Sequence, residues 1–304
     1  MDGRHAIGVD LGGTKILAGV VRRDGTVVRR HERETPHDSQ QHVVGELEAT
    51  VTALLDDSVC ALGFGAPSPI DQRRGVVVRC VNVPLVDSPL RNHMRERFGL
   101  PVGLDNDANA AAIGEWRAGA GRGVDDLVML TLGTGLGGGV IAGGRPFRGS
   151  NGAGVELGHV VIVYEGRPCQ GTCSGFGHLE AYVTGVAAGI AAREAFGPSA
   201  DAHRLVRLAK EGDSTATEIL AQIGRYLGAG MGSFANVFGP ELMVIGGGFG
   251  VAAWEYLMPS ALEIMQRETL PPMRETVRVE RAQLGTAAGL IGAAFVGFEA
   301  LDSA

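Results

Sequence analysis

The segment VDLGGTK, residues 9–15, decides how this chain is interpreted. It joins an apolar run, HAIGVDL (5–11), to a second one, ILAGVVRR (16–23). A strand that ends in glycines can hold a phosphate group, because backbone amides approach the oxygens with no side chain between them. The GK pair followed by Ser or Thr of a P-loop is absent. The sequence therefore predicts a phosphate-binding hairpin loop. Asp10, just before the loop, is expected to hold Mg²⁺ through water. The residues expected to take part are Asp10, Gly12, Gly13, Thr14 and Lys15.

A second segment repeats this layout in the other half of the chain. The apolar run LVMLTL (127–132) leads into GTGLGGG (133–139), and a strand-like VIAGG (140–144) follows. Two such units favour a duplicated βββαβα domain that closes on a shared ligand. GTGLGG also fits the dinucleotide pattern GxGxxG, but a strand follows where that pattern requires a helix N-terminus. The second loop is expected to contribute Thr131, Gly133, Thr134 and Gly135.

Glycine is enriched along the whole chain, with 48 glycines among 304 residues. There is no three-residue period and 45% of the residues are hydrophobic, which excludes collagen-like and disordered chains. A third cluster, Gly246, Gly247 and Gly248, lies between a strand and a helix. It indicates either close strand–helix packing or a flat seat for adenosine. Gly228, Gly230 and Gly232, inside a predicted helix, favour close helix packing.

Charge and hydropathy exclude several classes of protein. The net charge is −7 and basic residues occur in runs no longer than a pair, so we expect no nucleic-acid or membrane partner. The N-terminus has no signal-peptide pattern, and we expect the apolar stretch at 287–298 to be too short to span a bilayer. The sequence predicts a cytoplasmic protein.

The segment NDANAAA (106–112) follows a short strand-like run and begins an alanine-rich helix. Asp107 would lie at the positive end of that helix, which favours an ionised carboxylate and suits a general base. An Asn or Asp before such a run is also an ordinary N-cap, and spacing alone leaves both interpretations open.

Together, VDLGGTK, GTGLGGG, NDANAAA and the stretch from GVELGH (154–159) to GHLE (177–180) resemble the ROK sugar kinases of the actin-like ATPase superfamily, most closely the bacterial glucokinases. The resemblance covers residues 6 to about 290. It implies an α/β, two-domain actin-like ATPase (ribonuclease H-like) fold, with mixed sheets flanked by helices and the active site in the interdomain cleft. We expect a small domain at 1–117, completed by a C-terminal helix at 288–304, and a large domain at 118–287. Homodimers or homotetramers are also implied.

The resemblance further implies ATP-dependent, Mg²⁺-assisted phosphorylation of the 6-hydroxyl of a hexose, with Asp107 as catalytic base and glucose as the expected substrate. The implied sugar contacts are Asn82, Asn106, Asp107, Glu156, His159 and Glu180. Taken singly, Glu156 and His159 could be a surface pair and Asn82 a turn residue. Fructose, mannose or an N-acetylated amino sugar stays an alternative substrate, and polyphosphate an open donor. A sugar-responsive repressor of the same family is the other class, disfavoured because its helix-turn-helix domain would precede a loop that begins within ten residues of Met1.

A possible metal site concerns two of the four cysteines, which are too few for a disulfide scaffold. Residues of the right types for a tetrahedral Zn²⁺ are His159, Cys169, Cys173 and His178. Family members carry a pattern similar to CxCGxxGCxE here, with three cysteines. This chain has PCQGTCSGFGHLE, in which three residues separate the two cysteines and a histidine replaces the third cysteine. The alternatives are a structural zinc that fixes His159 and a metal-free loop with two reduced thiols.

Overall fold

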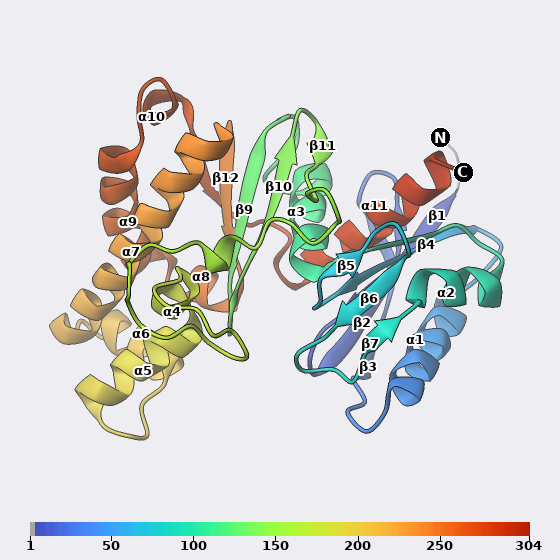
Figure 1. The fold of residues 1–304 in the computed structure, drawn as a ribbon, viewed down its shortest axis with the longest axis horizontal. Coiled ribbons are helices and arrows are strands. Elements are labelled where there is room, and N and C mark those ends of the chain that lie inside the picture. The colour runs from blue at the N-terminus through green and yellow to red at the C-terminus, as the bar shows by residue number, and fades with distance from the viewer. Residues whose placement is uncertain (1–3) are drawn as a thin grey trace. The chain divides into compact units, whose positions relative to one another are not determined.

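The computed structural model describes residues 4–304 and divides into two compact units (Figure 1). Unit 1 contains the described residues up to Gly123, together with Gly139–Val155 and Gln283–Ala304. Unit 2 contains Val124–Gly138 and Glu156–Ala282. Residues 139–155, which the predicted domain limits assign to the large domain, thus fall in unit 1. The C-terminal helix also belongs to unit 1.

Unit 1 is built on a five-stranded mixed sheet with the strand order β3-β2-β1-β4-β8. The first three strands are antiparallel neighbours, and β4 and β8 continue the sheet in parallel. Its strands are β1 (His5–Leu11), β2 (Lys15–Arg22), β3 (Val27–Glu34), β4 (Val59–Ala66) and β8 (Val102–Asn106). A small sheet of β5 (Ile70–Asp71), β6 (Val76–Arg79) and β7 (Val86–Ser88) adjoins it, with helix α2 (Leu90–Phe98).

Helix α1 (Gln40–Leu54) contributes to the main core of unit 1. It begins after Ser39, whose Oγ accepts a hydrogen bond from the backbone N–H of His42 at 3.2 Å, as an N-cap does. Val43, Leu47 and Val51 recur at helical spacing and are fully buried. The structure confirms the helix predicted from Ser39 to Leu55.

Helices α3 (Asp107–Ala118) and α11 (Ala288–Asp302) pack together, and α11 also packs on β1, β4 and β8. Glycines permit this approach. A Cβ atom at Gly63 would lie 1.7 Å from the carbonyl oxygen of Ala293, and one at Gly292 would lie 1.6 Å from that of Ala110. The backbones therefore touch where any side chain would overlap an oxygen.

Gly285–Asp302 is long and apolar enough to cross a membrane by length and composition, which corrects the expectation that this stretch is too short. The expectation considered only the central apolar residues. In unit 1 the segment forms a core helix, with 56% of its residues buried. A buried core helix can meet the same criteria of length and composition as a membrane-spanning helix.

The second sheet has the order β11-β10-β9-β12-β13. Its strands are β9 (Leu127–Leu132), β10 (Leu136–Ala142), β11 (Arg145–Pro146), β12 (Leu242–Gly246) and β13 (Arg278–Arg281). The order matches that of the first sheet strand for strand. In the first sheet Asp10 is paired with Gly65, and in the second Thr131 is paired with Gly246. The duplicated layout predicted from the two glycine loops is confirmed.

Strand β10 begins at Leu136, four residues before the strand-like segment that the sequence suggested. Glycine is usually a weak strand former, so the glycine run was interpreted as loop. Here the glycines make room: a Cβ atom at Gly138 would lie 2.7 Å from Cδ1 of Leu157, and one at Gly139 would lie 2.4 Å from Cβ of Ala112.

The remaining elements of unit 2 are mainly helical and follow the predicted order. They are η1 (Leu157–His159), α4 (Glu180–Val183), α5 (Gly185–Phe196), α6 (Ala202–Lys210), α7 (Ser214–Phe238), α8 (Gly248–Ala252), α9 (Trp254–Glu268) and α10 (Met273–Thr276). Helix α7 packs closely on α9, since a Cβ atom at Gly228 would lie 2.3 Å from the carbonyl oxygen of Ala261, and one at Gly232 would lie 2.9 Å from Cβ of Glu268. Gly230 instead faces Leu179. Close packing explains these glycines, as predicted.

Replacing Gly292 by alanine is expected to destabilise the protein by about 2 kcal/mol or more, because the added methyl group forces α11 away from α3. Gly45, in α1, is a matched control: a Cβ atom there has no neighbour within 4 Å. Gly45→Ala should leave stability unchanged or raise it by up to about 1 kcal/mol, since alanine is the better helix former. Thermal and urea unfolding of both variants measures the difference. Equal midpoints would contradict the packing argument.

Candidate active site

The junction between β8 and α3 carries Asn106 and Asp107. Asn106 is the N-cap, and its Oδ1 accepts hydrogen bonds from the backbone N–H groups of Ala108 (2.9 Å) and Asn109 (3.1 Å). Its Nδ2 donates to the carbonyl oxygen of Ser68 at 3.4 Å. Asp107 is the first helical residue, and its Oδ1 accepts from the N–H of Ala108 at 2.8 Å. The capping role therefore falls mainly to Asn106, which leaves the second carboxylate oxygen of Asp107 available for chemistry.

Two carboxylates of unit 1 have raised pKa values. Burial raises the pKa of Asp107 above its ordinary 3.8, against the opposing effect of its hydrogen bonds to backbone N–H. Burial and then the charge of Asp107 raise the pKa of Asp10 to about 7. A buried carboxylate whose pKa is raised further by a second carboxylate is one that a divalent cation would stabilise in its ionised form.

The first glycine loop joins β1 to β2 as a tight turn, in which the N–H of Gly12 donates to the carbonyl oxygen of Lys15 at 2.9 Å. A Cβ atom at Gly13 would meet only Cβ of Asn82, at 3.6 Å. Packing within the protein thus gives no reason for glycine at position 13, whereas an approaching ligand does. The ammonium group of Lys15 lies 2.5 Å from Glu32 on β3 and is largely exposed.

The second glycine loop joins β9 to β10. The N–H of Gly133 donates to the carbonyl oxygen of Gly135 at 2.9 Å, and the carbonyl oxygen of Gly133 accepts from the N–H of Gly185 at 2.8 Å. Glu180 supports the loop from the side, because its Oε2 accepts from the N–H of Leu136 at 2.8 Å. A Cβ atom at Gly135 would lie 2.7 Å from that same oxygen. Gly135 is therefore required for the contact with Glu180, while a Cβ atom at Gly133 would meet only the carbonyl oxygen of Gly135, at 3.9 Å.

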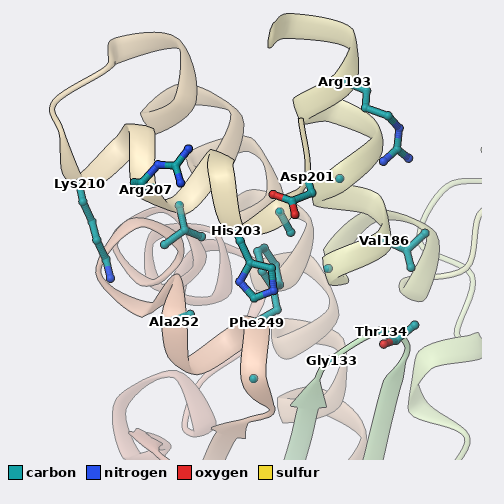
Figure 2. A pocket seen from close by; sticks show the side chains of 15 residues that line it. Gly133, Thr134, Val186, Arg193, Asp201, His203, Arg207, Lys210, Phe249 and Ala252 are labelled. Atoms are coloured by element: carbon teal, nitrogen blue, oxygen red, sulfur yellow. The ribbon is translucent and has the colours of Figure 1, made fainter. Parts of the chain in front are cut away.

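A cavity of about 760 Å³ opens beside this second loop (Figure 2). Gly133 and Thr134 form one part of its wall, and Gly248 and Phe249 of α8 form another. Gly247, just before α8, has a φ of 80° and packs on the backbone of Leu132, so it turns the chain sharply there. Parts of the second and third glycine clusters thus line one cavity in unit 2.

Four basic side chains of the cavity were missed by the sequence interpretation. They come from helices α5 and α6, and Figure 2 labels all four among the side chains that line the pocket. Asp201 is the acidic residue of the lining, and its carboxylate caps α6 through the N–H of Arg204. The basic residues are Arg193, His203, Arg207 and Lys210. The regular spacing of His203, Arg207 and Lys210 along one helix face was the signal available in the sequence.

The four residues predicted to bind a metal lie together in unit 2, with ligand atoms all within 4.8 Å of one another. The Nδ1 atoms of His159 and His178 are 3.3 Å apart, Cys169 Sγ lies 3.6 Å from His159 Nδ1, and Cys173 Sγ lies 3.5 Å from His178 Nδ1. A zinc tetrahedron with ordinary bond lengths puts two nitrogens about 3.3 Å apart and a nitrogen and a sulfur about 3.6 Å apart. The side chains therefore fit a tetrahedral ion.

Local structure explains how the altered cysteine spacing still brings the thiols together. Pro168 and Phe176 form an isolated antiparallel bridge, and the N–H of Cys169 donates to the carbonyl oxygen of Gly175 at 2.9 Å. The chain between turns back at Gly171, which has a φ of 62°. Burial raises the pKa of the Cys169 thiol to about 11 without a metal. A bound cation would lower this pKa and favour the thiolate, which is the form that ligates a metal.

The duplicated sheet, its paired glycine turns and the buried carboxylate at a strand–helix junction place the protein among the two-domain, actin-like sugar kinases. Residues 6–298 match the description of the ROK family, and the chain belongs to that family.

Relatives of known activity match over nearly the whole chain. The glucokinase of Streptomyces coelicolor is 34% identical over 95% of this chain and 96% of its own length. The structure is similar to that of a Streptomyces griseus ROK glucokinase in complex with glucose and AMPPNP, with a TM-score of 0.82, 34% identity and coverage of 97% and 99% of the two chains. It is also similar to the ROK hexokinase of Thermus thermophilus, with a TM-score of 0.84, 36% identity and coverage of 99% and 100%.

Proposed function

We propose that the protein is an ATP-dependent glucokinase that transfers the γ-phosphoryl group to the 6-hydroxyl of glucose. The observation that carries the proposal is the position of Asp107, a half-buried carboxylate at a helix N-terminus with its cap supplied by a neighbour. Glucokinases at 34% identity over 95% of the chain support glucose as the substrate. Fructose, mannose and N-acetylated amino sugars are the alternative acceptors.

Asp107 acts as the general base in this proposal. Phosphoryl transfer requires positioning of the acceptor and stabilisation of charge, plus one group that accepts the hydroxyl proton. Oδ1 of Asp107 is fixed by the N–H of Ala108, which orients the carboxylate toward one direction. Its raised pKa brings its basicity closer to that needed for proton transfer near neutral pH.

The nucleotide is proposed to bind in the cavity of unit 2, with adenosine against Gly248 and Phe249. The volume of about 760 Å³ suits a ligand of nucleotide size. Arg193, Arg207 and Lys210 give its lining a positive charge that favours a polyanion. The proposed nucleotide-phosphate and Mg²⁺ residues of unit 2 are Thr131, Gly133, Thr134 and Gly135, and those of unit 1 are Asp10, Gly12, Gly13, Thr14 and Lys15.

Mg²⁺ is proposed to be held through water by Asp10. The negative charge of Asp107 raises the pKa of Asp10, and a cation would offset that effect. When bound, the ion neutralises charge on the transferred phosphoryl group. Asp10 itself then stays ionised although it is buried.

Glucose is proposed to contact short polar side chains. Asn106 can offer only its amide N–H₂, because its carbonyl oxygen caps α3. Glu180 can offer Oε1, since Oε2 is held by Leu136. The other proposed contacts are Asn82, Glu156 and His159. A homodimer or homotetramer and a cytoplasmic location stay predictions from the resemblance.

Zinc is the proposed occupant of the His/Cys cluster, with a structural role. His159 belongs to the short helix η1 that directly follows Glu156. Fixing its imidazole through a metal would fix the adjoining proposed sugar contact. All four positions are filled by protein ligands, as in structural rather than catalytic zinc sites.

Asp107→Asn is expected to lower kcat with glucose by about 10²-fold or more, because the amide cannot accept the hydroxyl proton. Glucose affinity should change little, since an amide still hydrogen-bonds the sugar. ADP release with a panel of hexoses, and glucose titration by calorimetry, measure both. The exposed Asp57→Asn serves as control. Turnover near that of the wild type, or no ADP release by the wild type with any hexose, would contradict the proposal.

Wild-type kcat should fall as the pH is lowered through the raised pKa of Asp107, because only the unprotonated carboxylate accepts a proton. Above that pKa, kcat should level off. The acid limb should therefore lie above the ordinary aspartate pKa of about 3.9. Steady-state kinetics across pH, with circular dichroism at each point to show that the protein stays folded, gives the profile. A kcat that is constant down to about pH 4 in folded protein would refute the role.

Protein purified without added metal is expected to contain about one equivalent of zinc per chain, and chelation should lower its unfolding temperature. Cys173→Ser should lose the metal, whereas Cys60→Ser, outside the cluster, should keep it. Elemental analysis and thermal unfolding provide the readouts. If the purified protein contains no metal and a chelator leaves its unfolding temperature unchanged, the zinc site is ruled out.

A further inference from the structure

Asp105 is a buried carboxylate that the proposed reaction does not use. It directly precedes Asn106 and Asp107, and its side chain is 0% exposed. Oδ1 accepts hydrogen bonds from the N–H of Asn106 (2.9 Å) and from Nδ2 of Asn109 (3.1 Å). These bonds join the end of β8 to the first turn of α3. The carboxylate thus lies under the backbone segment that carries the proposed base.

The counter-charge for Asp105 comes from Arg148, in the loop that follows β11. Arg148 Nε donates to Asp105 Oδ2 at 2.6 Å. The other two nitrogens of the guanidinium donate to both carboxylate oxygens of Glu299 in α11, at 3.2 and 2.6 Å. A guanidinium is planar and donates in fixed directions, so two carboxylates on different elements define its position. Arg148 is only 20% exposed.

The loop that carries Arg148 is fixed at several further points. The N–H of Gly154 donates to the carbonyl oxygen of Arg148 at 3.0 Å, which closes the loop on itself. A Cβ atom at Gly152 would lie 2.4 Å from Cγ of Gln72, and Gln72 in turn donates to the carbonyl oxygen of Leu104 at 2.8 Å. The loop therefore contacts the end of β8 by a second route.

Strain at the end of this loop shows that its conformation is imposed by the surroundings. Val155 has a φ of 73°, a left-handed conformation that is unfavourable for a β-branched residue. Such strain persists only where neighbouring contacts determine the backbone. Val155 is followed in the chain by Glu156, a proposed sugar contact. One loop thus connects the base segment and a sugar-contact segment.

We infer that Arg148 is a positioning residue for phosphoryl transfer: by pairing with Asp105, it sets the direction in which Asp107 presents its carboxylate. The inference rests on the proposed function, in which Asp107 is the base. Loss of Arg148 leaves the Asp105 carboxylate buried and unpaired. Burial already raises the pKa of Asp105, so the carboxyl group then takes up a proton and no longer accepts hydrogen bonds in the same way. The backbone at Asn106, which donates to it, shifts together with Asp107.

The test compares four variants in the full-length protein. Arg148→Met removes the guanidinium but keeps most of the side-chain volume. Arg148→Lys keeps the positive charge but cannot donate to Asp105 and Glu299 in the fixed directions of a guanidinium. Arg23→Met is the matched control, because Arg23 makes an equivalent two-bond contact with Asp302 at the exposed end of α11. The double variant Asp105→Asn/Arg148→Met removes the cost of burying a carboxyl group without its counter-charge, but its amide has no guanidinium to hold it in position. For each variant kcat, the KM for glucose and the thermal unfolding midpoint are measured.

Arg148→Met is expected to lower kcat by about 10- to 100-fold, as small misplacements of a catalytic group do, with a smaller change in KM. Arg148→Lys should recover part of kcat and Arg23→Met should match the wild type. The double variant should regain stability but not kcat. That split separates positioning from a purely structural role, and it applies even if Arg148→Met folds poorly.

Two results would overturn the inference: a folded Arg148→Met protein with wild-type kcat, or a double variant that regains kcat together with stability. Asp107→Asn is assayed in parallel. Wild-type turnover in that variant contradicts the proposed function, whereas wild-type turnover in Arg148→Met contradicts only the present inference.

Discussion

The close approach of α11 to the sheet and to α3 is the constraint on which unit 1 depends. At Gly63 and Gly292 the backbones lie so close that a methyl group would overlap a carbonyl oxygen. Such contacts tolerate no larger residue, and they bury a helix whose length and composition alone would suit a membrane. Because α3 begins with Asp107, packing α11 against α3 also fixes the helix that presents the proposed base.

At the start of α3, three neighbouring residues divide three tasks. Asn106 satisfies the free N–H groups of the helix, which leaves Asp107 with one oxygen for chemistry. Asp105 points into the protein and ties the junction to Asn109 and Arg148. A carboxylate in the proposed role of base needs both partial burial and a rigid backbone, and here different residues provide them.

Local patterns predicted a large part of the fold and of the site. The paired glycine loops revealed the duplication, and the capping residue Ser39 located α1, because both effects act between residues close in sequence. The four metal-cluster residues were also predictable, since their types define the chemistry. The basic lining of the cavity was not predicted, because α6 contributes only through tertiary packing. Arg148 could not be found either: a single arginine carries no motif, and its partners Asp105 and Glu299 are distant in sequence.

The matching strand order of the two sheets shows how far two copies of one architecture have specialised. Asp10, at the end of β1, corresponds to Thr131 at the end of β9, as their equivalent strand pairings show. The last strand of the first copy, β8, ends at Asn106 and is followed by Asp107, whereas the last strand of the second copy, β13, is followed by Ala282 and Gln283, without a carboxylate. The proposed base thus lies in unit 1, and the cavity with the basic lining lies in unit 2. The shared strand order is thus kept in the scaffold, while the residues around it differ between the two copies, so that the proposed base has no counterpart after β13.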